Sequence, residues 1–407
     1  MAFRRALLVF AGMSSISCSL VYDFNDYQAL PSAGSGGGMS GSGGSGGGMS
    51  GSGGGMSGSG GSGGSGGTVS CDGVDFMQDP AHCGACGVNC AGGACNAGVC
   101  SPVATELTVQ GQQVATLGET VFVVRGVAAP GEMLTYSADF LPSEGPLSTE
   151  PVCDAVGFLS PGPLKVYFSP QNGTGACGMD SYVYSCGQGA PCAKTAYTIP
   201  FPLHINGMAV VKTDFYFLTP DGVLHMAPLS VDGIPSDSEV QPVRVESMVQ
   251  LGQGAYMIAH DPVGNALWWT TIEGCTYTVG VPQLPIGMAG CSAQTVPNPG
   301  PVFVSLNNKI YIGSLNAGIF SINPDVMVPE PALAFGAPEL RLLAVDSDYV
   351  YAYDTAVASL VALRHGAAVE RARIPVPGGI ASTDANHPKY VFFTVDSSLY
   401  RWRKPSP

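Results

Sequence analysis

The chain has 407 residues, a formal net charge of -14 and only 11% charged residues. This length accommodates two or three domains of ordinary size. An acidic surface repels phosphate backbones and anionic lipid headgroups, so we expect no nucleic-acid partner.

Residues 1–17 are typical of a secretory signal peptide. Arg4 and Arg5 make a basic start, and the apolar run over residues 6–13 is too short to span a bilayer. Small residues then lead to Cys18, as in a cleavage zone. The sequence therefore predicts an exported protein without a transmembrane helix after processing.

The cleavage zone contains a candidate lipidation site. Ser15-Ile16-Ser17-Cys18 resembles a bacterial lipobox, although Ser15 stands where Leu is preferred. Of 13 cysteines, 12 remain without Cys18, an even number that can pair fully in an oxidising compartment. The resemblance implies acylation of Cys18 and, with Ser19 next, an outer-membrane lipoprotein. The alternative is a plain signal peptide and a secreted or periplasmic protein.

Residues 18–70 are predicted to form a disordered tether. From residue 32 to 67 the chain is almost only Gly, Ser and Met. Such a segment has too little apolar surface to offset the entropy cost of ordering it. A flexible tether of this length has a root-mean-square span of about 40 Å and a fully extended reach of roughly 170 Å.

Residues 71–100 form a cysteine-rich module. A segment this short cannot build a core, so cross-links of about 2 to 4 kcal/mol each must stabilise it. Zinc at the C-x-x-C of Cys83 and Cys86 is the alternative, but the second knuckle of a zinc ribbon is missing. Calcium at Asp72, Asp75 and Asp79 is disfavoured against solvated turn carboxylates. We expect three disulfides among Cys71, Cys83, Cys86, Cys90, Cys95 and Cys100, with the pairing left open.

The CGACG centre of this module, residues 83–87, is the basis of a resemblance. The run resembles the cysteine-rich module of exported myxobacterial-type proteins, which usually lies between a lipoprotein signal and a β domain. His82 stands where that family usually has Asn. The resemblance implies no catalytic role.

Residues 101–205 alternate β-branched and aromatic residues in short runs bounded by turn residues, which predicts a β-sandwich. The runs Leu134-Thr135-Tyr136 and Gly178-Met179-Asp180-Ser181-Tyr182 resemble cadherin-like, immunoglobulin-like repeats of bacterial surface proteins. That resemblance implies an immunoglobulin-like sandwich. We expect two local bridges among Cys153, Cys177, Cys186 and Cys192.

Residues 206–407 contain five repeats, with aromatic centres near residues 216, 268, 311, 350 and 392. A strand-only repeat of about 40 residues predicts propeller blades and resembles the irregular propellers of bacterial surface proteins. We expect five blades, closed by an outer strand from residues 197–205. Two further repeats near Val123 and Tyr167 permit the alternative of one seven-bladed propeller over residues 104–407. Cys275 and Cys291 are expected to bridge adjacent strands of one blade.

Side chains capable of catalysis are scattered. The chain has no H-E-x-x-H motif, and its histidines lie in different units; they are His82, His204, His225, His260, His365 and His387. His260, His365 and His387 fall near turns, where they could face one ligand-binding rim of a propeller, but exposed turn positions are the favoured interpretation. Carboxylates that end inner strands would suit a glycosidase channel, and they are Asp261, Asp346 and Asp384. Asp or Asn recurs at one position in three repeats, just before the aromatic strand, and is interpreted as a turn residue. These residues are Asp214, Asn308 and Asp348.

The sequence thus predicts an all-β, surface-anchored lipoprotein with a non-enzymatic binding or structural role. No catalytic residue, metal or cofactor is expected. The expected partners are the membrane, through the lipid anchor only, and an extracellular protein or glycan. The alternative is a propeller hydrolase or lyase that acts on extracellular polysaccharide.

Overall fold

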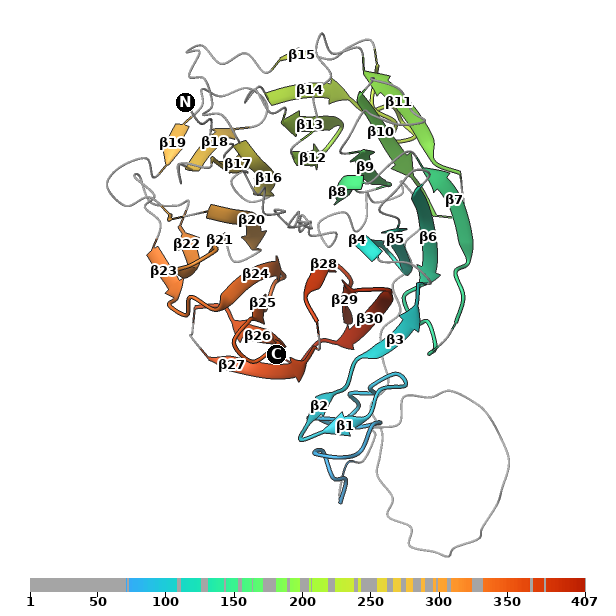
Figure 1. Cartoon of the computed structure of the whole chain (residues 1–407), viewed down its shortest axis with the longest axis vertical. Helices are drawn as coiled ribbons and strands as arrows, with labels where there is room; N and C mark the ends of the chain where they lie inside the picture. Colours follow the sequence, from blue (N-terminus) through green and yellow to red (C-terminus); the bar gives the residue numbers. More distant parts are fainter. Residues whose placement is uncertain are drawn as a thin grey trace, which may run out of the picture.

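The fold is seen in a computed structural model (Figure 1), in which every described element is a β-strand. The described part of the chain contains no helix long and apolar enough to cross a membrane. The structure describes residues 71–406 except 72, 108–110, 126–130, 143, 153–155, 163, 171–180, 189–190, 198–204, 206, 219–223, 238–240, 243–254, 262–265, 272–275, 281–286, 290–295, 298, 306–308, 324–331, 367–368 and 377.

The described strands form seven four-stranded antiparallel sheets arranged as blades around one centre (Figure 1). The inner strands are β4 (Gly111–Leu117), β8 (Val156–Pro161), β12 (Gly207–Val211), β16 (Ala255–Asp261), β20 (Pro299–Ser305), β24 (Leu340–Val345) and β28 (Ile380–Asp384). Each inner strand lies against the next one, and β28 lies against β4. The ring is therefore closed.

The second strand of each blade is the apolar, aromatic one. These strands are β5 (Thr120–Arg125), β9 (Val166–Pro170), β13 (Asp214–Leu218), β17 (Ala266–Thr271), β21 (Lys309–Ser314), β25 (Tyr349–Asp354) and β29 (Tyr390–Val395). In β29, Val391 and Phe393 pack with residues of the preceding blade, while Tyr390 and Phe392 pack with residues of the first blade. Since side chains alternate between the faces of a strand, β29 is apolar at all positions but Thr394 because both of its faces are buried.

The third and fourth strands complete the blades towards the outside (Figure 1). The third strands are β6 (Gly131–Ser137), β10 (Ser181–Cys186), β14 (Leu224–Pro228), β18 (Thr276–Gly280), β22 (Gly318–Ile322), β26 (Ser359–Arg364) and β30 (Ser398–Arg403). The fourth strands are β7 (Ser148–Val152), β11 (Ala193–Tyr197), β15 (Gln241–Pro242), β19 (Gly287–Ala289), β23 (Ala332–Phe335), β27 (Glu370–Pro375) and β3 (Val103–Glu106). We number the blades 1 to 7 from β4 onward, so that blade 7 comprises β28, β29, β30 and β3.

Blade 7 is completed by a strand from the other end of the chain. β3 pairs antiparallel with β30, with Val103 opposite Arg401 and Glu106 opposite Ser398. A closing strand from the N-terminal side was expected, but its predicted location at residues 197–205 is wrong. Tyr197 instead ends β11, the outer strand of blade 2.

The all-β class, the disulfide-rich module and the propeller are confirmed, but the sandwich predicted for residues 101–205 is wrong. Those residues supply β3 and the eight strands of blades 1 and 2. Each of these two sheets joins neighbours in sequence, whereas a sandwich would exchange strands between two sheets. Short amphipathic strands with frequent turns look alike in both folds, so the pattern did not separate them. The alternative of one seven-bladed propeller is confirmed.

The cysteine-rich module precedes the ring and lies outside blade 7 (Figure 1). It contains the three disulfides that the sequence predicts, Cys71–Cys86, Cys83–Cys95 and Cys90–Cys100. Its short hairpin consists of β1 (Cys95–Asn96) and β2 (Val99–Cys100). Gly84, within the CGACG run, has φ +74°, and a Cβ there would meet Gly98 O at 2.5 Å. The motif therefore needs glycine at this position.

The other expected bridges are only partly described. Cys186 and Cys192 form a disulfide between β10 and the segment before β11. Cys18, Cys153, Cys177, Cys275 and Cys291 lie outside the described residues.

The interface between blades 7 and 1 allows a stability test of ring closure. Leu399 on β30 is fully buried in the core that these two blades share. We expect Leu399→Ala to lower the free energy of unfolding by about 2 to 5 kcal/mol, because it leaves a cavity. Urea denaturation measures this. Leu147→Ala is the matched control, because Leu147 is 65% exposed, and its effect should stay within about 0.5 kcal/mol. Equal small effects for both variants would contradict the closed interface.

Candidate functional site

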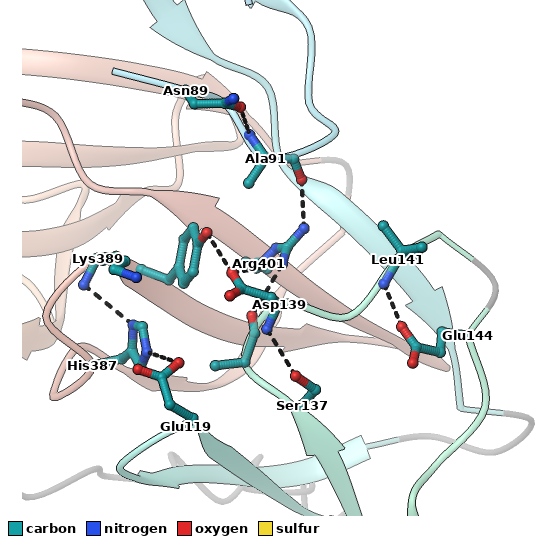
Figure 2. Close-up of polar contacts among 12 residues, drawn as sticks. Asn89, Ala91, Glu119, Ser137, Asp139, Leu141, Glu144, His387, Lys389 and Arg401 are labelled. Carbon is teal, nitrogen blue, oxygen red and sulfur yellow. Dashed lines mark hydrogen bonds and ion pairs between the residues drawn. The ribbon is translucent and has the colours of Figure 1, made fainter. Parts of the chain in front are cut away.

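A pocket of about 480 Å³ opens where the cysteine module meets blades 7 and 1. The segment after β6 supplies Asp139 and Leu141, and β29 supplies Tyr390 (Figure 2). The cations come from β30 and from Lys389, the residue before β29. We call it the junction pocket, lined by Gly87, Asn89, Ala91, Asp139, Leu141, Lys389, Tyr390, Arg401 and Arg403. Its volume lies within the range of about 300 to 1,000 Å³ that is common for small-molecule sites.

Arg401 is the buried cation of the junction pocket and is 2% exposed. Its guanidinium donates to Ala138 O at 3.1 Å and to Ala91 O at 2.6 Å, and Nη1 lies 3.5 Å from Asp139 Oδ1 (Figure 2). These partners belong to blade 1 and to the cysteine module. The guanidinium also lies 5.0 Å from the Tyr390 ring centre, a favourable cation–π arrangement. Burial lowers the pKa of Arg401, but an arginine remains charged at neutral pH.

Tyr390 connects the pocket to the interblade core. Its hydroxyl donates to Asp139 Oδ1 at 2.6 Å. Burial and then this hydrogen bond raise the pKa of Tyr390, so the phenol stays neutral and remains a donor. Asp139 Oδ1 thus faces both the phenol and the Arg401 guanidinium, and this fixes the position of the carboxylate.

Lys389 and Arg403 are the accessible cations of the pocket. Lys389 is exposed and Arg403 is partly exposed. Arg403 lies over the Tyr390 ring at 5.6 Å. With the described part of the chain, neither side chain forms a hydrogen bond or an ion pair. Their charges are therefore available to a ligand.

His387 lies beside the pocket and is buried, with 1% exposure. Its Nδ1 accepts from the backbone N–H of Lys389 at 3.2 Å, so the neutral ring carries its proton on Nε2. Nε2 lies 3.3 Å from Glu119 Oε2 (Figure 2). The ring also stacks on Tyr390. The expectation of an exposed turn histidine is wrong here, because His387 packs at the interface of blades 7 and 1.

Asp384, one of the candidate channel carboxylates, holds the ring closed. It is fully buried and accepts from the backbone N–H and hydroxyl of Thr116 on β4 and from Asn386. Burial raises the pKa of Asp384, and these hydrogen bonds oppose the rise. Its oxygens are therefore directed at blade 1.

Asp346 is a second candidate carboxylate and is also engaged. It accepts from the Tyr351 hydroxyl at 2.9 Å and forms an ion pair with Lys404 at 2.6 Å. Its backbone carbonyl lies 2.6 Å from His365 Nε2, and His365 Nδ1 lies 3.0 Å from the Tyr311 hydroxyl of blade 5. These residues join blades 5 and 6.

The remaining candidates are separated from one another. His225 stacks on Phe217 of the neighbouring strand, and His82 Nδ1 accepts from Gly87 N–H at 3.0 Å. Asp75 and Asp79 accept from backbone N–H groups two residues on, as the turn interpretation predicts. Asp214 begins β13, and Asp348 directly precedes β25. Asp72, His204, Asn308 and the side chains of His260 and Asp261 lie outside the described residues.

Apart from the contact of His365 with the backbone carbonyl of Asp346, the structure shows no hydrogen bond or ion pair between the candidate carboxylates and histidines that it describes. Among these residues, the groups of three potential metal ligands within 4.8 Å are Cys71, His82 and Cys86, and Cys83, Cys90 and Cys100. Each of these cysteines is bonded in a disulfide. Their proximity reflects cross-linking.

The junction pocket was missed by sequence reasoning, which concentrated on histidines and carboxylates. A usable signal was present in the last strand. Arg401 and Arg403 are two apart and therefore share a face of β30. With Lys389 they make three of the 16 lysines and arginines of an acidic chain.

Comparison with known proteins supports the fold alone. No family model matches the chain, and no curated protein matches it. The chain is similar in structure to the β-propeller domain of Myceliophteria thermophila Cps50 (Swd1), with a TM-score of 0.55 and 10% sequence identity. The similarity covers 73% of this chain and 96% of that domain. The chain is thus a β-propeller protein by structure.

The buried histidines generate a pH prediction. Burial lowers the pKa of His387 and of His365. As pH falls through the ordinary histidine value of about 6.5, the unfolded chain takes up protons that the folded chain does not. We therefore expect the urea midpoint to fall between about pH 7.5 and 5.5. The fall should continue until the lowered folded-state pKa values are reached.

The variant His387→Gln isolates this effect. We expect it to reduce the pH dependence of the urea midpoint, whatever its effect on stability at pH 7.5. The shift at pH 7.5 measures the loss of packing and hydrogen bonds separately. An unchanged pH dependence would contradict a buried, neutral His387.

Proposed function

We propose that the chain is an exported, lipid-anchored protein whose propeller has a non-enzymatic binding role. Its ligand would be an extracellular protein or glycan, and its only contact with a membrane would be the lipid on Cys18. No nucleic-acid partner is proposed for a chain of net charge -14.

The observation that carries this proposal is that the candidate catalytic groups Asp346, Asp384, His365 and His387, which the structure describes, are bonded to other parts of the protein. A glycosidase needs two carboxylates that flank one bond of the substrate. Asp384 and Asp346 instead hold blade contacts, with Thr116 and Lys404 among their partners. His365 and His387 are bonded within the blade interfaces as well. The junction pocket offers mainly cations, which suit binding better than hydrolysis.

The segments before the propeller support presentation outside the cell. Disulfides of the kind found in the cysteine module persist in oxidising compartments. The predicted tether of residues 18–70 is long enough to hold a folded head clear of a lipid surface. The module would then join flexible chain to the rigid ring.

The binding role is tested by a screen with the processed chain that begins at Cys18. Acidic glycans, neutral glycans and envelope proteins are immobilised, and both binding and release of cleaved product are measured. We expect reversible binding of at least one class without cleavage. Cleavage of a bound polysaccharide would favour the hydrolase or lyase alternative, and no binding at all would contradict the binding role.

Attachment of the protein to a membrane through Cys18 is tested by fractionation of whole cells. We expect the wild-type chain in the membrane fraction and the Cys18→Ser variant in the soluble periplasmic fraction or the medium. Ser19→Ala is the matched control, because it leaves the acylated thiol in place. Equal membrane retention of all three proteins would contradict a lipid anchor at Cys18.

A further inference from the structure

We propose that the junction pocket binds a carboxylate-bearing sugar unit, a uronate, of an acidic glycan. This inference rests on the proposed binding function and specifies its ligand and its site. It locates recognition at the outer junction of the cysteine module with blades 7 and 1, away from the central channel.

The junction pocket is positively charged, unlike the chain as a whole. The pocket lining contains the cations Lys389, Arg401 and Arg403 against one carboxylate, Asp139, which leaves two positive charges in excess. The whole chain carries -14. A local positive site in an acidic protein attracts an anionic group to that site.

The positive charges of the pocket are of two kinds, one held in place and two accessible. Arg401 is held in place by two carbonyls from different parts of the fold, Ala138 O and Ala91 O. Arg401 keeps a positive charge in the lining of the pocket, while the side chains of Lys389 and Arg403 form no hydrogen bond or ion pair with the described part of the chain. Planar guanidinium groups pair well with carboxylates. An arriving carboxylate would complete the pairing of Arg403 and Lys389.

The pocket also presents a hydrogen-bond acceptor, Asp139, and a donor, Asn89, beside its cations. Asp139 uses Oδ1 for the Tyr390 hydroxyl and the Arg401 ion pair, and its side chain is still 57% exposed. Its Oδ2 is directed to no described donor. Asn89 Oδ1 accepts from Ala91 N–H, which leaves the Asn89 amide N–H groups as donors (Figure 2). A sugar hydroxyl can donate to Asp139 and accept from Asn89.

The combination of cations with Asp139 and Asn89 favours a uronate over other anions. A sulfate ion has no hydroxyl to offer Asp139, and inorganic phosphate lacks the set of ring hydroxyls that a sugar presents to Asp139 and Asn89 together. The carboxylates of an acidic peptide would pair with the cations, but a run of Asp or Glu offers no hydroxyl to Asp139, and the lining provides only the exposed Leu141 as a large aliphatic side chain. A uronate carries both the carboxylate and the hydroxyls, and a unit of one or two sugars suits a pocket of about 480 Å³.

The test is calorimetric titration of the processed chain with a galacturonic acid trisaccharide and with its methyl ester. The ester keeps every hydroxyl, removes the negative charges and adds one methyl group to each carboxylate. We expect the acid to bind about tenfold or more tightly than the ester, and its affinity to fall as salt concentration rises. Equal affinity of acid and ester would overturn the proposal.

Variants assign the binding to the pocket. Lys389→Gln and Arg403→Gln remove accessible charges without touching the buried Arg401, and each should weaken acid binding by about tenfold. Lys212→Gln and Arg364→Gln are the matched controls, because these residues are exposed elsewhere on the ring. They should bind as the wild type does. Circular dichroism of each variant establishes that the fold is retained.

Two further ligands decide between anion classes. Tri-glutamate and inorganic phosphate are titrated under the same conditions, and we expect neither to match the trisaccharide. Equal binding of either would overturn the assignment to a sugar. Binding of a screened glycan or protein that the pocket variants leave unchanged would overturn the pocket and keep the proposed function. No binding of any ligand would overturn both.

Discussion

The structure depends on one buried cation. Arg401 lies on β30, the strand that pairs with the N-terminal β3, and its guanidinium is satisfied by carbonyls of the cysteine module and of blade 1. A buried charge without such partners would cost several kcal/mol, so the segments that supply them are held in place together. Next to it on β30, Trp402 donates to Cys100 O at 3.0 Å. These neighbours join the module, the first blade and the last blade into one unit.

The blade pattern could be predicted from sequence because the second strands whose burial the structure describes, such as β21 and β29, are mainly apolar and buried on both faces. The five aromatic centres after residue 206 all fall on second strands, and Val123 and Tyr167 lie on the second strands of blades 1 and 2. The two repeats near Val123 and Tyr167 were hard to recognise because a sandwich strand of the same length has the same alternation. What decides between them is which strands pair, and pairing over long sequence separations leaves little trace in a single sequence.

The candidate site was less predictable for a similar reason. Asp384 and Asp346 stand where channel carboxylates would stand, yet the partners that engage them, Thr116 and Lys404, come from other blades or from the chain end. The cations of the junction pocket are Lys389, just before β29, and two arginines of β30, whereas its carboxylate comes from Asp139, more than 200 residues earlier. Only the closed ring brings them together. The cysteine module, whose cysteines are consumed in disulfides, contributes to this pocket through its backbone and Asn89.

The central claim is that β3 is an integral strand of blade 7 and closes the ring. Hydrogen exchange of the full chain, followed by mass spectrometry of peptides from β3, β29 and β30, tests it most directly. The closed ring predicts that amides of β3 are protected as strongly as those of β29 and lose protection in the same cooperative unfolding step. Rapid exchange of β3 while β29 and β30 remain protected would contradict it.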